Sequence, residues 1–220
     1  MMTTDSSVES SSPWLNSRRK RIIDLAIAVL ASVIALPIIM ASAVGIRLTS
    51  PGSVFFRHQR AGLNGQPFIV CKLRTMRNVT PGKDLATQSD ADRLTRFGIF
   101  LRRYSIDELP QLVNVLRGDM SIVGPRPLPM PYNTRYTPEQ RRRLLARPGL
   151  TGLSQATTRN SSEWPQKLAL DVEYIARASF LLDLKIILGT FRVVLTGSGV
   201  AAPGHATMPE FKAINSESDQ

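Results

Sequence analysis

The segment SIDELPQL contains two adjacent carboxylates, Asp107 and Glu108, which are the first candidates for chemistry. Capping alone explains both acids, because Ser105 and Glu108 have the spacing of a capping box and acids stabilise a helix N-terminus. Pro110 fits a slightly later helix start, with Asp107 as the N-cap. A chemical role uses the same placement, since a carboxylate at a helix N-terminus among arginines can hold Mg²⁺ against a diphosphate. Because adjacent acids repel each other, the pKa of one of them should rise.

Basic residues in several motifs favour the chemical role. Arginine offers two parallel hydrogen bonds to a phosphate, and lysine offers a point charge. Taken alone, each such residue is more often a solvated surface charge, and the run Arg141–Arg143 also suits contact with anionic lipid. The candidates lie just before the acids, in CKLRTM, in GPRP and in a Ser/Thr-rich loop, and they are Lys72, Arg74, Arg96, Arg102, Arg103, Arg126 and Arg159.

Asp171 lies between Leu168 and Ile175 on one face of an expected helix. This position predicts a buried carboxylate that pairs with one of the arginines, rather than a group that acts on substrate. A single cysteine excludes an intramolecular disulfide, and with two histidines it argues against a closed zinc site. The sequence contains no GxxxxGK loop or GxGxxG fingerprint, so a nucleotide would not be bound in those ways.

The net charge of the chain is +11, which implies an anionic partner: nucleic acid, a phosphate ligand or a membrane surface. Residues 1–17 and 205–220 are acidic, Ser-rich or polar, and lack an apolar period, so both are predicted to be disordered tails. The remaining body carries +15. Aromatic residues make up only 6% of the chain and cluster in apolar segments, which argues against nucleic acid as a partner.

The elements that would position these residues begin with an apolar segment, Leu25–Ile46, that has no formal charge. Its 22 residues would form a helix of about 33 Å, so length alone favours a single membrane span. Pro37 near its middle predicts a break, and basic residues on both flanks favour the same side of the membrane for both ends. A re-entrant helix-break-helix anchor over residues 18–47 is therefore the preferred prediction.

The rest of the chain is predicted to be mostly helical with a small β element, which gives an α+β fold class. Ser53–Met76 is predicted to be a hairpin around the turn signal Asn64-Gly65. The last helix has a sparsely charged apolar pattern that suits a position in the membrane interface. Helices are expected over residues 92–118, after Thr137, over 163–178 and over 181–195.

Taken together, these motifs resemble a known family. The segments KRIIDLAIAVLASVIALPIIM, SPGSVFFRHQRAGLNGQPFIVCKLRTM, RFGIFLRRYSIDELPQLVNVLRGDMSIVGPRP, RPGLTGLSQATTRN and LDVEYIARASFLLDLKIILGT occur in the family's order. They resemble the bacterial sugar transferases, and more fully the monotopic polyprenyl-phosphate phosphoglycosyl transferases, from about Arg18 to Gly199.

The resemblance implies a Mg²⁺-dependent enzyme on the cytoplasmic face of the bacterial inner membrane. Such an enzyme transfers a sugar-1-phosphate from a UDP-sugar to undecaprenyl phosphate and releases UMP, as the first membrane step of a surface glycan pathway. Asp107 would be the nucleophile and a Mg²⁺ ligand, and Glu108 would act on the lipid phosphate acceptor. Asp171 would be a supporting acid. The phosphate-binding residues would be Lys72, Arg102, Arg126 and Arg159.

The domain division follows from these assignments: an anchor at 18–47 and a cytoplasmic-face catalytic domain at 48–204, in a minimal catalytic form. Two departures from the family pattern are Leu36-Pro37 in place of Ser-Pro, and SQATTRN in place of QVNGRN before Arg159. The alternative from another class is a membrane-tethered basic module that binds anionic lipid or nucleic acid without catalysis. The sequence leaves homo-oligomer formation and the identity of the sugar open.

Overall fold

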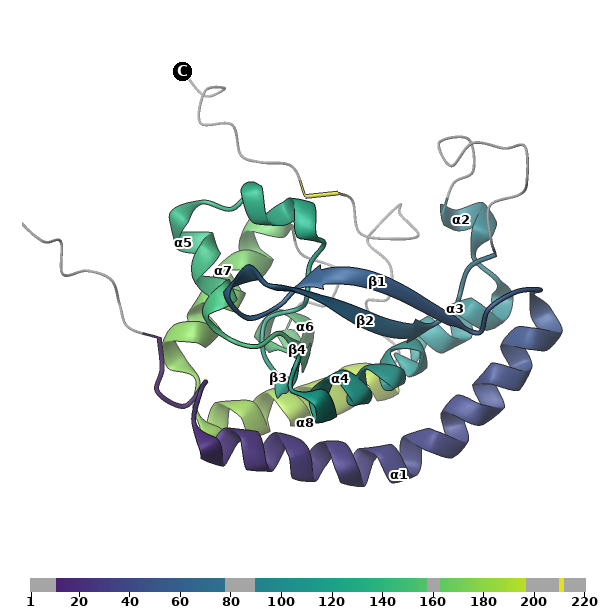
Figure 1. The fold of residues 1–220 in the computed structure, drawn as a ribbon, viewed down its shortest axis with the longest axis horizontal. Helices are drawn as coiled ribbons and strands as arrows, with labels where there is room; N and C mark the ends of the chain where they lie inside the picture. The colour runs from purple at the N-terminus through teal and green to yellow at the C-terminus, as the bar shows by residue number, and fades with distance from the viewer. Residues whose placement is uncertain (1–10, 78–89, 158–162, 197–209, 212–220) are drawn as a thin grey trace, which may run out of the picture.

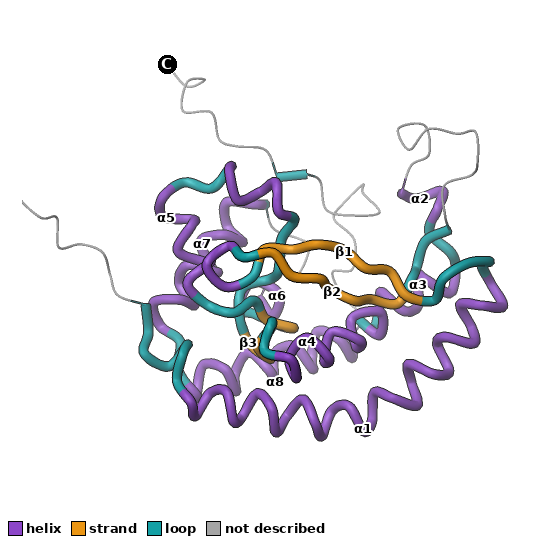
Figure 2. Tube along the Cα trace, viewed as in Figure 1, coloured by secondary structure: helices purple, strands orange, loops and turns teal. Residues whose placement is uncertain are grey.

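The computed structural model describes residues 11–77, 90–157, 163–196 and 210–211. Helices predominate, and the described strands form a long hairpin and a short parallel pair (Figure 2). The helices and strands are α1 Arg18–Thr49, β1 Phe55–Ala61, β2 Pro67–Leu73, α2 Asp90–Arg93, α3 Arg96–Arg103, α4 Leu112–Arg117, β3 Ser121–Val123, α5 Pro138–Arg141, β4 Gly149–Thr151, α6 Leu153–Thr157, α7 Trp164–Arg177 and α8 Phe180–Thr196.

Helix α1 is continuous over 32 residues, with Ser17 as its N-cap and Pro37 inside it. The break predicted at Pro37 is therefore wrong, because one proline removes a single backbone hydrogen bond and bends a helix without ending it. Figure 1 shows α1 as an arc that runs along one side of the molecule. By length and composition, α1 could cross a membrane, and most of its large apolar side chains are exposed.

The predicted hairpin is confirmed. Strands β1 and β2 pair antiparallel, from Phe55 opposite Leu73 to Ala61 opposite Pro67. The turn residues Asn64 and Gly65 have φ values of 55° and 74°. Asparagine and glycine tolerate these left-handed conformations better than other residues, which is why this dipeptide predicted the turn.

The helix predicted over residues 92–118 is interrupted. Ser105 adopts a left-handed conformation with φ 54° and ψ 23° after α3, and a 3₁₀ helix η3, Ile106–Gln111, leads into α4. Pro110 lacks the backbone N–H that a longer α-helix would use at this point. Gly118, with φ 97°, ends α4 as predicted.

The main hydrophobic core lies between α1 and the helices that run along it. From α1 it takes the small side chains of Ala28 and Ala35, which are at most 3% exposed. Small residues on a helix allow a neighbouring helix to approach closely. The core also includes Val115 of α4, Tyr174 of α7 and Ile186 of α8. The helices predicted over 163–178 and 181–195 correspond to α7 and α8, so both predictions are confirmed.

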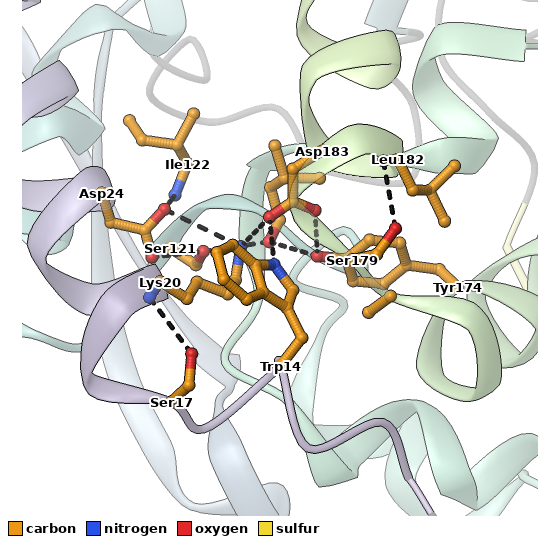
Figure 3. Close-up of polar contacts among 12 residues, drawn as sticks. Trp14, Ser17, Lys20, Asp24, Ser121, Ile122, Tyr174, Ser179, Leu182 and Asp183 are labelled. Atoms are coloured by element: carbon orange, nitrogen blue, oxygen red, sulfur yellow. Dashed lines mark hydrogen bonds and ion pairs between the residues drawn. The ribbon is translucent and has the colours of Figure 1, made fainter.

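A buried polar cluster attaches the start of α1 to the rest of the protein (Figure 3). Lys20 Nζ lies 2.6 Å from Asp183 Oδ2 on α8, and Trp14 Nε1 donates to the same oxygen over 2.8 Å. Asp24 accepts hydrogen bonds from Ser121 Oγ and from the backbone N–H of Ile122. The first turns of α1 are thereby fixed to both α8 and β3.

Of the two predicted tails, the structure describes residues 11–17 and 210–211, and both of these segments contact the rest of the protein. Ser12 donates a backbone hydrogen bond to Ile175, and Leu15 is only 4% exposed. Phe211 is 2% exposed and packs against the rings of Tyr132 and Trp164. Scattered apolar residues in a polar stretch give no periodic signal, which is why the sequence did not predict these contacts. The other residues of both tails lie outside the described ranges.

Candidate active site

Asp107 and Glu108 lie on the 3₁₀ helix η3, immediately after the left-handed Ser105. The predicted capping box is not formed, because the Ser105 side chain makes no capping hydrogen bond. Asp107 does not serve as the N-cap either, since it lies inside η3. Capping therefore does not account for the acids, and their side chains are placed by the contacts of η3 with β2.

Glu108 is held by two cations, one on β2 and one in the loop that follows β3. Lys72 Nζ of β2 lies 2.6 Å from Glu108 Oε1, and Arg126 Nη2 lies 2.8 Å from the same oxygen. Burial would raise the pKa of Glu108, but the charges and hydrogen bonds of Arg126 and Lys72 outweigh burial and hold that pKa well below its usual range. Glu108 is therefore an anion at every pH at which a cell operates.

Asp107 has the opposite electrostatic environment. It is 8% exposed, and its carboxylate has no hydrogen bond or ion pair within the part of the chain that the structure describes. Burial and the negative charge of Glu108 raise the pKa of Asp107 to about 6. The prediction that one pKa of the pair rises is confirmed. At neutral pH the result is an ionised, largely buried carboxylate without a partner among the described residues, which suits a nucleophile.

Both acids face one cavity of about 400 Å³, a volume suited to a small ligand. Three of the predicted phosphate-binding residues line it, namely Lys72, Arg102 and Arg126. Arg102 donates from Nε to Thr75 Oγ1 over 2.9 Å, which directs it from α3 across the end of β2. The fourth, Arg159, lies outside the described residues. The cavity therefore combines a free carboxylate with several cations, as a diphosphate would require.

Asp171 is a buried carboxylate paired with an arginine, as predicted. Arg143 Nη2 lies 2.8 Å from Asp171 Oδ2, and Ser154 Oγ donates to Oδ1 over 2.9 Å. Arg143 also donates to the backbone carbonyl of Arg126 over 2.6 Å. The predicted lipid contact of Arg141–Arg143 is wrong for Arg143, which is 3% exposed. The pair supports the turn that carries Arg126.

The sequence patterns did not predict several residues that line the cavity. Burial and the charge of Arg126 lower the pKa of Arg60 to about 10 and that of Lys167 to about 8. Arg60 is near the end of β1, and Lys167 is on the first turns of α7, so no local spacing connects either of them with the acids. Further cavity residues that the sequence did not indicate include Gln111, Tyr132, Ser154, Gln155 and Trp164.

The cavity could hold a magnesium ion through one protein carboxylate together with the phosphates of a substrate. Among the described residues there is no group of three or more His, Cys, Asp or Glu side chains that could hold a metal ion. Mg²⁺ is commonly held by one or two carboxylates together with substrate phosphates and water. The unpartnered carboxylate of Asp107 can supply the one protein ligand that such a site needs, whereas Glu108 is occupied by Lys72 and Arg126.

Comparison with known proteins identifies the family. The model of the family described as "Bacterial sugar transferase" matches residues 15–197. "Uncharacterized sugar transferase EpsL" of Bacillus subtilis is 43% identical over 192 residues, which are 87% of this chain and 95% of that protein. "UDP-glucose:undecaprenyl-phosphate glucose-1-phosphate transferase" of Caulobacter vibrioides is 46% identical over 187 residues, 81% of this chain and 70% of that protein. A protein of the same name from Xanthomonas campestris is 42% identical, over 78% of this chain and 37% of that protein.

The chain therefore belongs to the bacterial sugar transferase family. Within that family it is an enzyme of the phosphoglycosyl transferase class, as the resemblance predicted. The alternative of a basic module without catalysis is wrong.

Proposed function

We propose that this enzyme transfers a sugar-1-phosphate from a UDP-sugar to undecaprenyl phosphate and releases UMP, through a phosphosugar-aspartyl intermediate on Asp107. One observation carries the proposal. Asp107 is a buried carboxylate without a partner among the described residues, in a cationic cavity where the adjacent Glu108 is fixed by two cations. The relatives' printed names include undecaprenyl phosphate and UDP-glucose, which supports the acceptor and makes UDP-glucose the first donor to test.

The reaction consists of two displacements at the same phosphorus. A carboxylate oxygen of Asp107 attacks the sugar-bearing phosphorus, the new O–P bond forms, and the bond from that phosphorus to the bridging oxygen breaks. UMP leaves with the electron pair of that bond. An oxygen of undecaprenyl phosphate then attacks the same phosphorus, and the aspartyl O–P bond breaks. Asp107 is regenerated as a carboxylate, and the product is the diphosphate-linked sugar lipid.

The cations of the cavity neutralise charge that the substrates bring and that UMP carries away. Lys72 and Arg126 line the cavity, and both are fixed by hydrogen bonds to Glu108. Arg102 adds a third positive charge. A Mg²⁺ ion held by Asp107 and the diphosphate would supply charge neutralisation on the leaving group. The role on the lipid phosphate that the resemblance implies for Glu108 stays a prediction, as do the role of Arg159 and homo-oligomer formation.

The placement in the membrane is part of the proposal. A straight helix of the length of α1 would extend about 48 Å, more than the thickness of a hydrocarbon core. Yet both ends of α1 contact the same body: Lys20 reaches Asp183 near the start, and Arg74 Nη2 donates to the Ser50 carbonyl just after the end. A helix that crossed the bilayer would place those ends on opposite sides. Attachment of both ends supports a monotopic, re-entrant arrangement. The basic residues on both flanks of the apolar segment favour the cytoplasmic face of the inner membrane.

Helix α8 presents a second exposed apolar surface. Figure 1 shows it on the same side of the molecule as α1. Its exposed apolar residues suit the interface between hydrocarbon and headgroups, where the phosphate of the lipid acceptor lies. These residues are Phe180, Leu181, Leu184, Leu188, Phe191 and Leu195.

The function is tested with purified protein, UDP-glucose, Mg²⁺ and undecaprenyl phosphate, read out as UMP release. Without the acceptor, wild-type protein should release about one UMP per enzyme and gain the mass of one sugar phosphate. Asp107→Asn should do neither, while the matched control Asp92→Asn, at an exposed position on α2, should behave as wild type. Turnover by Asp107→Asn at the wild-type rate would disprove the assigned nucleophile. If UDP-glucose fails, a panel of UDP-sugars identifies the donor.

The topology is tested separately in intact cells, in a Cys71→Ser background. One cysteine is introduced at the exposed position Asn16, before α1 in the chain, and another at the exposed position Gln59, after α1. Both should be shielded from an external thiol reagent that does not cross the membrane. Labelling of only one of them would contradict the re-entrant arrangement and support a helix that spans the membrane.

A further inference from the structure

Gln111 is a buried polar side chain that the mechanism above does not use. It is the last residue of η3, it lines the cavity, and it is 3% exposed. Its amide nitrogen Nε2 is buried, and the described part of the chain offers that nitrogen no hydrogen-bond partner. Leaving a buried donor unpaired destabilises a protein, so such a group calls for a functional explanation.

Other side chains of the cavity wall are paired, although Gln155 Oε1, an acceptor, also has no partner among the described residues. Glu108 is bound by Lys72 and Arg126, and elsewhere on the cavity wall Arg143 is bound by Asp171. The Asp107 carboxylate and the Gln111 amide, both on η3, are the exceptions along this helix. The residue that is assigned to attack the substrate is therefore accompanied by an unpaired donor on the same short helix.

The helical repeat places Gln111 close to the reacting groups. A 3₁₀ helix has three residues per turn, so residues i and i+3 lie on the same side. Gln111 is therefore one turn beyond Glu108 and on its side of η3, where the cavity lies. Lys72 and Arg126 meet Glu108 at this point, so the same region attracts the phosphates of a donor substrate.

We propose that Gln111 is a catalytic residue whose Nε2 donates a hydrogen bond to a non-bridging oxygen of the sugar-bearing phosphoryl group. The inference rests on the proposed phosphosugar transfer. A phosphoryl oxygen only accepts hydrogen bonds, so it complements a donor that lacks an acceptor. During phosphoryl transfer, charge is spread over the equatorial oxygens, and a pre-positioned donor in a site with little water stabilises it.

The test is the variant Gln111→Met, which keeps the length and volume of the side chain and removes the donor. The turnover number should fall by about 100-fold, the lower part of the range for loss of one donor at a developing oxyanion. Thermal stability should stay equal or rise, because Gln111 loses no described protein hydrogen bond and a buried unpaired donor disappears. The matched control is Gln59→Met, an exposed position on β1 outside the cavity, which should retain wild-type activity.

Binding measurements identify the group that Gln111 contacts. Gln111→Met should weaken the binding of UDP by about tenfold, the effect of one hydrogen bond to a charged group, and leave UMP unchanged. UMP lacks the second phosphate, so it reports on the rest of the nucleotide site. Weaker binding of the UDP-sugar with unchanged binding of UDP would assign the contact to a sugar hydroxyl and overturn the proposal.

Two further outcomes would overturn it. Wild-type turnover by Gln111→Met would show that the donor is not used, and a loss of activity accompanied by a lower unfolding temperature would show a structural role. Failure of this inference is distinguishable from failure of the proposed function. In the first case Asp107→Asn is inactive and Gln111→Met is normal, whereas in the second Asp107→Asn itself retains turnover.

Discussion

Lys20 Nζ lies 2.6 Å from Asp183 Oδ2, and this ion pair connects the first turn of α1 with the first turn of α8 (Figure 3). Both side chains are at least 90% buried. Asp183 also accepts from Trp14 Nε1 and from the Tyr174 hydroxyl, so its carboxylate is the centre of the attachment. A helix held in this way moves together with the catalytic body, so in the proposed membrane arrangement the attachment would fix the height of the cavity relative to the lipid headgroups.

Replacing Asp183 with Asn should destabilise the protein by about 3 kcal/mol, the lower end for breaking a buried ion pair. The reason is that, among the described residues, the buried ammonium of Lys20 would keep Asp24, at 3.8 Å, as its one anionic neighbour. The measurement is thermal or denaturant unfolding in detergent. Asp92→Asn, at an exposed position, is the control. A stability equal to that of the control would show that the cluster does not hold α1 in place.

Asp107→Asn should stabilise the folded protein at pH 8 by about 1 to 3 kcal/mol, since its pKa is raised from 3.8 to about 6. The folded state keeps this proton to higher pH than the unfolded state does, because burial and Glu108 disfavour the charge. The wild-type protein therefore loses stability as pH rises from about 4 to 6, and the Asn variant lacks that loss. Unfolding of both proteins between pH 4 and 8 tests this: the difference should vanish near pH 4. A constant difference would contradict the raised pKa.

The dependence of kcat/KM on pH should follow the ionisation of the nucleophile. Only the carboxylate attacks phosphorus, so the value should rise about tenfold per pH unit below pH 6 and level off above it. Arg102 lowers the pKa of Asp107 by its charge, so Arg102→Met should move the midpoint to higher pH. Arg103→Met, at the next and exposed position, should leave the midpoint unchanged. A midpoint that does not respond to Arg102 would mean that another group titrates.

The elements that the sequence predicted correctly have local causes. The hairpin follows from Asn64-Gly65 between two apolar runs, and the stop at Gly118 follows from its left-handed conformation. Helices α7 and α8 have long periodic patterns. The interruption at Ser105 has no such cause, because serine is an ordinary residue there and its positive φ depends on how α3 and η3 pack. The predicted helix over 92–118 was wrong for that reason.

The site was predictable to the extent that it lies within motifs. Asp107, Glu108 and Arg126 stand in short segments whose residue types already suggest phosphate chemistry, and the structure brings them to one cavity together with Lys72. Arg143 could not be distinguished from its neighbours in a run of three arginines, since only packing decides which of them is buried. The same holds for the attachment of α1, where the partners Lys20 and Asp183 are 163 residues apart.

The Arg143–Asp171 pair leads to a prediction that combines stability with activity. Asp171→Asn would leave the guanidinium of Arg143 buried without its anion, which should destabilise the fold by about 3 to 5 kcal/mol. Activity should fall as well, because Arg143 donates to the backbone carbonyl of Arg126 and so helps to place that residue. The side chain of Arg126 in turn binds Glu108. The double variant Arg143→Met, Asp171→Leu removes both charges and should recover most of the stability, as replacement of buried ion pairs by apolar residues often does. It should not recover the activity, since Met cannot donate to that carbonyl. Unfolding and UMP release, measured on both variants, separate the two effects, and full recovery of both would show that the pair has no part in positioning Arg126.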